Sequence, residues 1–223
     1  MTSLPQTLPA PEPSGFRLVF TLAMAGLLSG LAIVGAYEWT LPIIEANNAA
    51  ALRRAVFKVV PGSEQMQGLI LADGAARPAG PDETADVYAA YSAEGAFIGY
   101  AIAAEGAGFQ DTIRLLYGYD PGARQIIGME ILESRETPGL GDKIYKDAHF
   151  VGNFDALAVD PPIVAVKAGE KSAPNEVDAI TGATISSKAV VRIIGGANDR
   201  WLQLLPAPGA VPPLAAPPQG GAP

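Results

Sequence analysis

Residues 87–132 read VYAAYSAEGAFIGYAIAAEGAGFQDTIRLLYGYDPGARQIIGMEIL, and their pattern predicts the centre of the fold. Runs of aromatic, β-branched and small apolar residues alternate with turn-forming residues, as in consecutive β-strands. The expected strands are Val87–Tyr91, Phe97–Ala103, Thr112–Tyr119 and Gln125–Leu132. Short connections such as Ala93-Glu94-Gly95 and Asp120-Pro121-Gly122 join antiparallel neighbours. The stretch therefore predicts a meander of antiparallel strands.

Helical patterns lie on both sides of this meander. Residues Glu45–Val60 place apolar side chains at helical spacing and stop at Pro61-Gly62, and Ser186–Leu205 repeat that spacing. A further short strand is expected at Ile163–Lys167. The order helix, strands, helix predicts an α+β domain over residues 45–205, with its helices packed on one face of the sheet.

An uncharged stretch precedes the domain. Residues Leu18–Tyr37 read LVFTLAMAGLLSGLAIVGAY, twenty positions without a charge. At about 1.5 Å per residue, such a helix is about 30 Å long and spans a bilayer core. A cleaved signal peptide is the alternative, but its apolar region has only about 7–15 residues. We expect a single transmembrane anchor over residues 16–41, with a helix break at Pro42.

Both ends of the chain differ in composition from the domain. Residues 1–15 contain four prolines, and residues 206–223, PAPGAVPPLAAPPQGGAP, contain seven prolines and no charge. Segments of this kind bury too little apolar surface to offset chain entropy. We therefore expect a disordered N-terminal segment over residues 1–15 and a Pro-rich disordered tail over residues 206–223.

Composition excludes several classes of function. Cysteine is absent, which excludes disulfides, thiolate clusters and cysteine nucleophiles. The chain has one histidine, His149, and a formal charge of -8, which argue against a His-rich metal site and a nucleic-acid binder. No G-x-S-x-G sequence accompanies His149, which we expect in an exposed polar turn. We predict no independent catalytic site and no metal site.

Residues Asp178–Thr184, DAITGAT, form the first candidate site. Hydroxyl side chains lie close together in this region, at Thr181, Thr184, Ser186 and Ser187. Gly182 and Ala183 have little side-chain bulk, and a helix is expected to follow, so free N–H groups face an incoming anion. The segment therefore suits a phosphate group. A helix start with a Ser or Thr cap remains the alternative.

Residues Glu136–Lys143, ETPGLGDK, form the second candidate site. Pro138 stiffens the loop, and Gly139 and Gly141 flank Leu140, so the loop can lie against a flat ring. Lys143 would place positive charge near a phosphate or a reduced ring. A surface turn is the alternative. The spacing is neither that of a P-loop nor that of a Rossmann dinucleotide site.

Together these stretches resemble a known family. Asp178-x-x-Thr181-Gly182-Ala183-Thr184 is similar to the D-x-x-[ST]-G-A-T motif of covalently flavinylated FMN-binding domains, and Glu136–Gly141 to their ETPGLG loop. A membrane anchor before such a domain resembles the G subunit of Rnf electron-transport complexes. The C subunit of the sodium-translocating NADH:quinone reductase shares both motifs. This chain resembles the Rnf subunit more closely in its length, which is shorter than that of the quinone reductase subunit, and in the runs ETPGLGDK and ITGATISSKAVV.

The resemblance implies a cofactor and the residues that hold it. In the family, a flavin transferase takes FMN from FAD and joins it by a phosphoester to the last motif Thr, here Thr184. Asp178 matches the acidic motif position. The loop would border the flavin ring, with Leu140 against it and Thr137 or Glu136 near its polar edge. The expected FMN-binding residues are Thr184, Asp178, Thr181, Gly182, Ala183, Ser186, Glu136, Thr137, Gly139, Leu140 and Lys143.

The resemblance also implies a role. We expect an electron-transfer subunit of an ion-translocating ferredoxin:NAD oxidoreductase, with other redox and membrane subunits as partners and no nucleic acid. It would sit in the bacterial inner membrane with its domain in the periplasm. The alternatives are the equivalent quinone reductase protein, a stand-alone membrane-tethered flavin reductase, and a non-redox anchor in which residues 178–184 only cap a helix.

Overall fold

The structure, a computed structural model, describes residues 14–72, 75–80 and 83–214. The expected N-terminal segment lies outside these residues except for its last positions. The chain divides into two compact units, residues 1–50 and 51–223. Helix α1 (Gly15–Val59) contributes to both units.

In the first unit, α1 is apolar and its side chains are exposed. It is the one helix among the described residues that has the length and composition to cross a membrane. The expected break at Pro42 is wrong, because Pro42 lies inside α1. Proline removes a single intrahelical hydrogen bond, and the other bonds of this long helix carry it past that position. Helix α1 therefore contains all of the expected anchor, residues 16–41, and runs past Pro42 to Val59.

The second unit is built on an antiparallel sheet of seven strands in the order β2-β1-β3-β4-β5-β6-β7. The strands are β1 (Gln65–Ala72), β2 (Ala75–Pro78), β3 (Val87–Tyr91), β4 (Phe97–Ala107), β5 (Thr112–Asp120), β6 (Gln125–Glu133) and β7 (Leu157–Ala158). Strands β8 (Val164–Val166) and β9 (Glu176–Asp178) form a separate parallel pair. The predicted meander is confirmed as β3 to β6.

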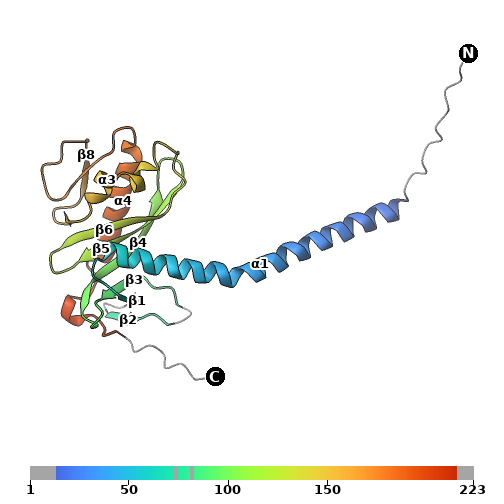
Figure 1. The fold of residues 1–223 in the computed structure, drawn as a ribbon, viewed down its shortest axis with the longest axis horizontal. Helices are drawn as coiled ribbons and strands as arrows, with labels where there is room; N and C mark the ends of the chain where they lie inside the picture. The colour runs from blue at the N-terminus through green and yellow to red at the C-terminus, as the bar shows by residue number, and fades with distance from the viewer. Residues whose placement is uncertain (1–13, 73–74, 81–82, 215–223) are drawn as a thin grey trace, which may run out of the picture. The chain divides into compact units, whose positions relative to one another are not determined.

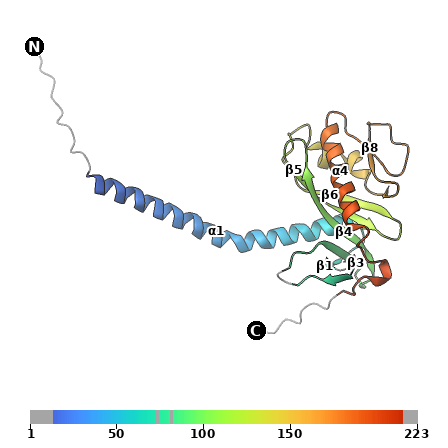
Figure 2. The ribbon, with the colours of Figure 1, turned by 180° about the vertical axis from the view of Figure 1, so that it is seen from behind.

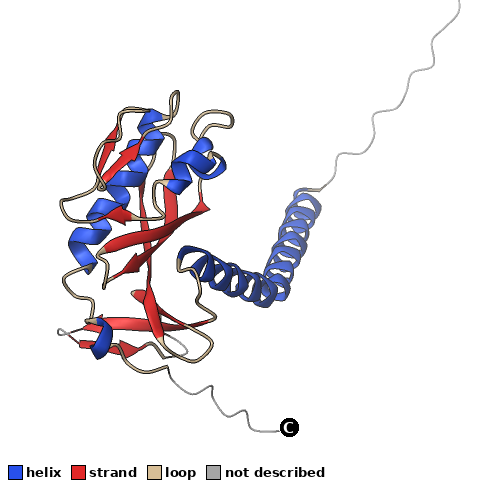
Figure 3. Cartoon of the chain, turned by 60° about the vertical axis from the view of Figure 1, so that its left-hand side comes forward, coloured by secondary structure: helices blue, strands red, loops and turns tan. Residues whose placement is uncertain are grey.

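Short helices and one long helix complete the unit. They are α2 (Lys143–Lys146), α3 (Ala148–Gly152), α4 (Thr184–Trp201) and the 3-10 helix η1 (Pro208–Ala210). Figure 1 and Figure 2 show α4 lying across the sheet, with α3 and β8 near its N-terminal end. The mixture of helices and antiparallel strands, coloured in Figure 3, confirms the predicted α+β class.

Helices cover both faces of the sheet, so the expectation of a single covered face is wrong. One face carries the larger core, in which α4 buries Val190 and Ile194 against β3 to β6. The opposite face holds a second cluster, in which the end of α1 buries Val56 and Val59 against Leu116. Alternate strand residues point to opposite faces, so each face needs its own cover.

Two glycines explain why the end of α1 lies so close to the sheet. A Cβ atom at Gly118 or Gly128 would collide with the backbone carbonyl of Val59. Any larger residue at either of these two positions would push the end of α1 away from the sheet. The expected helix over residues 45–60 is therefore the last part of α1, which ends at Val59, and its residues from Leu52 onward pack on the sheet.

Residues 206–214, part of the expected disordered tail, make specific contacts with the domain. The hydroxyls of Tyr100 and Tyr91 donate to the carbonyls of Pro206 and Pro212 at 2.8 and 2.7 Å. Val211 and Leu214 pack against the larger core. Apolar residues between the prolines provide the contact that a purely polar tail would lack. Residues 215–223 lie outside the described part of the chain.

Candidate functional site

The DAITGAT segment forms a tight turn between β9 and α4. Gly182 adopts a positive φ of 83°, which side chains rarely tolerate. The amide of Ala183 donates to the carbonyl of Ile180 at 3.0 Å and closes the turn. Helix α4 then begins at Thr184 with Ala183 as its N-cap. The helix-cap alternative is therefore wrong, because an alanine side chain cannot accept a hydrogen bond.

The three hydroxyls in the first turn of α4 have different roles. Ser187 is buried: its Oγ accepts from the Ile180 amide at 3.1 Å and donates to the Ala183 carbonyl at 2.9 Å. Ser186 is also buried and donates to a carboxylate. Thr184 is exposed, and its Oγ1 makes one long bond of 3.3 Å to the Ile180 carbonyl. Thr184 is therefore the available hydroxyl at the start of α4.

The backbone at the start of α4 is open to an anion. Within the described residues, the amides of Thr184, Ile185 and Ser186 donate to no protein acceptor, because no side chain caps the helix. Free amides and the positive end of the helix dipole both favour negative charge here. The predicted phosphate site agrees with this geometry.

Both predicted motifs line one cavity of about 350 Å³. The ETPGLG loop contributes Thr137, Leu140 and Gly141, and the turn with the start of α4 contributes residues 182–186. Phe109 completes the wall from the loop between β4 and β5. The structure thus brings together stretches that lie about forty residues apart in the sequence. We call this space the Thr184 cavity.

The rim of the Thr184 cavity is apolar. Phe109, Leu140 and Ile185 are exposed by 62%, 52% and 59%. Gly139, with a positive φ of 78°, turns the loop so that Leu140 faces this space. Sequence reasoning missed Phe109 and Ile185. The sequence feature that could have indicated Phe109 is the glycine before it. A Cβ atom at Gly108 would collide with Glu136 and Asp111, so the loop that carries Phe109 lies close to Glu136.

Glu136 lies behind the cavity wall and not at its polar edge as expected. Its Oε1 accepts from the amides of Phe109 and Gln110 at 2.9 and 3.0 Å, and its Oε2 accepts from Ser186 at 2.5 Å. Burial of this carboxyl opposes ionisation, but these hydrogen bonds outweigh it and lower the pKa of Glu136. Glu136 therefore ties together the three segments that line the cavity.

Thr137 remains at the cavity, as expected. Its hydroxyl donates to Oε1 of Gln110 at 2.7 Å, so it braces the same Phe109–Gln110 loop from the outer side. Gly141 must be small, because a Cβ atom there would collide with Glu136 and Ser186. These contacts explain why the loop needs its particular residues.

Asp178 faces a second cavity, of about 320 Å³, on the other side of the turn. Its Oδ1 accepts from the amides of Gly169 and Lys171, both at 3.1 Å, and its Oδ2 lies 3.6 Å from Nε2 of His149. Thr181 and Lys143 also line this space. We call it the Asp178 cavity.

The structure thus divides most of the predicted site residues between two cavities, whereas Gly139 and Glu136 line neither. Lys143 was expected near the phosphate or the ring, but it lines the Asp178 cavity. His149 is exposed as expected, although it lies in α3 and not in a turn. Within the described ranges, no group of three or more His, Cys, Asp or Glu side chains could hold a metal ion.

Comparison with known proteins identifies the family of this region of the chain. Residues 108–198 match the FMN-binding domain family. The chain is 30% identical over 181 residues to the G subunit of the proton-translocating ferredoxin:NAD(+) oxidoreductase complex of Clostridium ljungdahlii, an alignment covering 81% of this chain and 88% of the relative. It is 36% identical over 112 residues to the G subunit of the ion-translocating oxidoreductase complex of Methanosarcina acetivorans.

The extent of these matches varies. The Methanosarcina alignment covers 50% of this chain and 56% of the relative. With the G subunit of the Na(+)-translocating ferredoxin:NAD(+) oxidoreductase complex of Acetobacterium woodii, identity is 35%, and the alignment covers 49% of this chain and 52% of the relative. The chain thus spans about half the length of these two relatives.

Solved structures share the fold. The C subunit of the Na(+)-translocating NADH-quinone reductase of Parabacteroides distasonis superposes with a TM-score of 0.60 at 20% identity, covering 73% of this chain and 94% of that one. NqrC of Shewanella oneidensis gives 0.53 at 18% identity, with coverages of 67% and 91%. The long Clostridium match and the shared fold lead to one assignment. The chain belongs to the family of G subunits of ion-translocating oxidoreductase complexes.

Proposed function

We propose that this chain is a membrane-anchored electron-transfer subunit that carries FMN on Thr184 in an ion-translocating ferredoxin:NAD oxidoreductase complex. The observation that carries the proposal is the Thr184 cavity, where an exposed hydroxyl, free helix amides and an apolar rim meet. The named relatives are subunits of such complexes, which supports the same role for this chain.

Thr184 is the proposed attachment point because its hydroxyl is accessible and weakly held. Ser186 and Ser187 are buried and serve the turn and Glu136, and Thr181 lines the other cavity. In the proposed transfer, Oγ1 of Thr184 attacks the FMN-side phosphorus of FAD. The new O–P bond forms as the pyrophosphate bond breaks, AMP leaves with the bonding electrons, and the hydroxyl proton is released. A flavin transferase would supply the catalysis.

The start of α4 would hold the resulting phosphodiester. The amides of Thr184, Ile185 and Ser186 are free donors, and Gly182 and Ala183 leave the backbone accessible. Such donors bind an anion without needing a lysine or arginine. This fits a site whose nearest predicted cation, Lys143, lines the other cavity.

The apolar rim would hold the flavin ring. Phe109, Leu140 and Ile185 expose large apolar side chains that a flat ring would cover, and their burial would stabilise the bound ring. Thr137 supplies the polar group at this wall. Glu136 positions the wall from behind through its three hydrogen bonds.

FMN would supply the redox chemistry, since it accepts and passes on electrons, whereas the protein tethers and orients it. No acid or base is required of the chain for that role. Helix α1 would anchor the protein in the bacterial inner membrane with its domain on the periplasmic side. One apolar helix offers no ion path, so ion translocation would belong to partner proteins of the complex.

The test is covalent labelling. The full chain, produced together with a flavin transferase, should keep flavin fluorescence after denaturing electrophoresis. Thr184→Val should abolish this signal, whereas Thr181→Val, which removes a hydroxyl from the other side of the turn, should retain it. Fluorescence that persists in Thr184→Val, or a wild-type chain without fluorescence, would contradict the proposal.

A further inference from the structure

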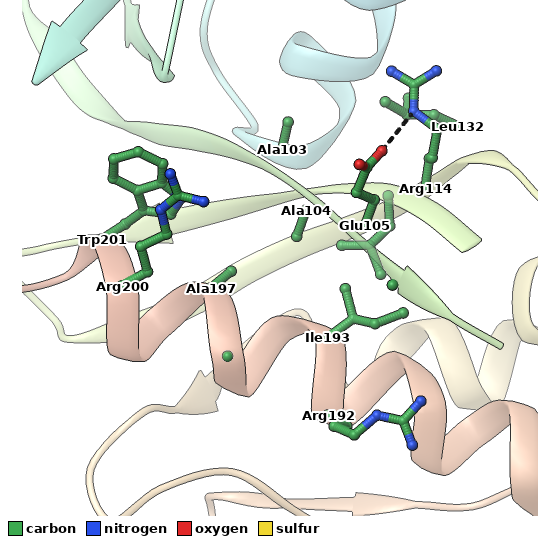
Figure 4. Close-up of a pocket in the computed structure, with 13 residues that line it drawn as sticks. Ala103, Ala104, Glu105, Arg114, Leu132, Arg192, Ile193, Ala197, Arg200 and Trp201 are labelled. Carbon is green, nitrogen blue, oxygen red and sulfur yellow. Dashed lines mark ion pairs between the residues drawn. The ribbon is translucent and has the colours of Figure 1, made fainter. Parts of the chain in front are cut away.

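A third cavity, of about 460 Å³, lies between α4 and the strands β4 to β6, away from both motif cavities. Figure 4 shows Ile193 and Ala197 on the side of α4 that faces Ala104 on the sheet, with Arg192 toward one end of the cavity and Arg200 and Trp201 toward the other. Ala104, Ile193 and Ala197 provide an apolar floor of mostly short side chains. We call this cavity the α4 groove.

The arginines of the α4 groove are not equally neutralised. The guanidinium nitrogens of Arg114 lie 3.4 Å from a carboxylate oxygen of Glu105 and 3.5 Å from one of Glu133, so these two acidic neighbours offset its charge. Arg192 donates to the Ala107 carbonyl at 2.5 Å, and Cζ of Arg200 lies 4.5 Å from the centre of the Trp201 ring. Neither arginine pairs with a carboxylate of the described chain. The groove thus carries two uncompensated positive charges on a chain of net charge -8.

The spacing of these charges restricts what can fill the groove. Arg192 and Arg200 are eight positions apart on α4, which corresponds to about 12 Å at about 1.5 Å per residue. The Arg192 guanidinium lies against the Ala107 carbonyl and that of Arg200 lies over the Trp201 ring, so the two groups point apart (Figure 4) and a single small anion could pair with both only if these contacts broke. In an extended peptide, side chains four positions apart point to the same face and lie about 13 Å apart. The side chain midway between them would face the apolar floor.

We propose that the α4 groove binds an extended acidic segment of a partner polypeptide. This segment carries carboxylates four positions apart with an apolar side chain midway between them. The carboxylates pair with Arg192 and Arg200, and the apolar side chain packs on Ala104, Ile193 and Ala197. Relatives of this chain are subunits of complexes, so such a partner is available to them. The inference does not depend on FMN or on Thr184.

The test uses a fluorescein-labelled heptapeptide with glutamate at its second and sixth positions and leucine at its fourth. It is titrated into the full chain in uncharged detergent, and binding is followed by anisotropy. A Trp39→Phe background leaves Trp201 as the one tryptophan, so its emission reports on the groove directly. We expect saturable binding that shifts the Trp201 emission and weakens as salt is added.

Matched variants separate charge from fold. Arg192→Gln with Arg200→Gln should weaken binding about tenfold, because two ion pairs are lost. Arg54→Gln with Arg124→Gln removes the same charge elsewhere on the chain and should leave binding unchanged. Arg192→Lys with Arg200→Lys keeps both charges and should retain most of the affinity, and the glutamine variant should give the same far-ultraviolet circular dichroism spectrum as the wild type, which shows that its loss of binding is not a loss of fold.

Four results would overturn the inference. The first is no binding of the peptide, and the second is equal binding of the same peptide with glutamine in place of glutamate. The third is displacement by succinate or inorganic phosphate at the peptide's own concentration, which would assign the groove to a small anion. The fourth is self-association of the chain that the two arginines control, which would assign the groove to a second copy.

Discussion

The two cavities beside the Thr181–Gly182 turn differ in chemistry although one short segment separates them. The Thr184 cavity presents Phe109, Leu140 and Ile185, which are apolar and exposed. The Asp178 cavity presents charged and ionisable side chains, namely Lys143, Asp147, His149 and Asp178. The motif residues are therefore divided between a side suited to a flat ring and a side suited to ionic contacts.

This difference has a simple structural origin. Strand β9 ends at Asp178, which is held by the amides of Gly169 and Lys171, and α4 begins at Thr184. The positive φ of Gly182 reverses the chain between them. Under the proposed function, the Thr184 side would keep the cofactor, and the transferase that attaches it would recognise the Asp178 side.

Among variants that compare the two cavities, we expect Asp178→Asn to have the largest effect on covalent labelling. An asparagine oxygen can still accept from the Gly169 and Lys171 amides, so the loop should keep its shape, but the negative charge is lost. We expect the rate of covalent labelling by the transferase to fall about tenfold, because a charge-assisted contact is removed. Labelling at the wild-type rate would show that the charge of Asp178 is not recognised.

Variants on the other side should give the opposite result. Replacing Leu140 and Phe109 together with alanine removes most of the apolar rim and leaves Thr184 in place. We expect covalent labelling to proceed, with a shifted flavin absorption spectrum and a redox potential closer to that of free FMN, because the ring becomes solvated. An unchanged spectrum and potential would exclude these side chains from contact with the ring.

Glu136→Gln tests whether the cavity wall depends on a charged group. The ionised carboxylate accepts three hydrogen bonds, so its replacement should cost about 1–2 kcal/mol of unfolding free energy at pH 7. The pKa of Glu136 is lowered on folding, so this contribution is complete above the ordinary value of 4.5 and disappears as pH falls through the folded-state value.

The measurement is chemical denaturation of wild type and Glu136→Gln at several pH values. The stability difference should be widest near neutral pH and should shrink as the pH falls below the ordinary value of 4.5. A difference that stays constant over this range would mean that the charge of Glu136 contributes nothing. Thr137→Val, which removes one exposed hydrogen bond to Gln110, provides a variant whose effect should not depend on pH.

The smallest effect is expected for Thr181→Ala. Thr181 is exposed, lines the Asp178 cavity, and makes no side-chain hydrogen bond within the described residues. We expect a reduction in labelling rate of about threefold or less, as for the loss of a single weak contact. A complete loss of labelling would place the acceptor or an essential contact on the Asp178 side and would break the comparison.

The sequence predicts the central strands well because their apolar runs end at clear turn residues. It does not predict β1 and β2. Gln65, Gln67 and Gly68 interrupt the apolar pattern of β1, which forms a strand through its pairing with β3. It also predicts a helix break at Pro42, because the rule that proline ends helices considers only the neighbouring residues. In the structure the other hydrogen bonds of the long helix outweigh the one that Pro42 removes.

The candidate site is predicted in part for a similar reason. The motifs identify Thr184, Leu140 and the turn, because these roles depend on local residue type. They do not show that Glu136 lies behind the wall or that Lys143 faces the Asp178 cavity, since both facts depend on how distant segments pack. Phe109 joins the site through the contacts of its loop with Glu136 and Thr137.

The most direct test of the account is the mass of the peptide that contains Thr184. It is measured on the full chain purified from its native host, or after production with a flavin transferase. We predict that this peptide is heavier by FMN less one water and that fragmentation places the added mass on Thr184. An unmodified Thr184 in such material would contradict the proposed role of this chain as an FMN-carrying electron-transfer protein.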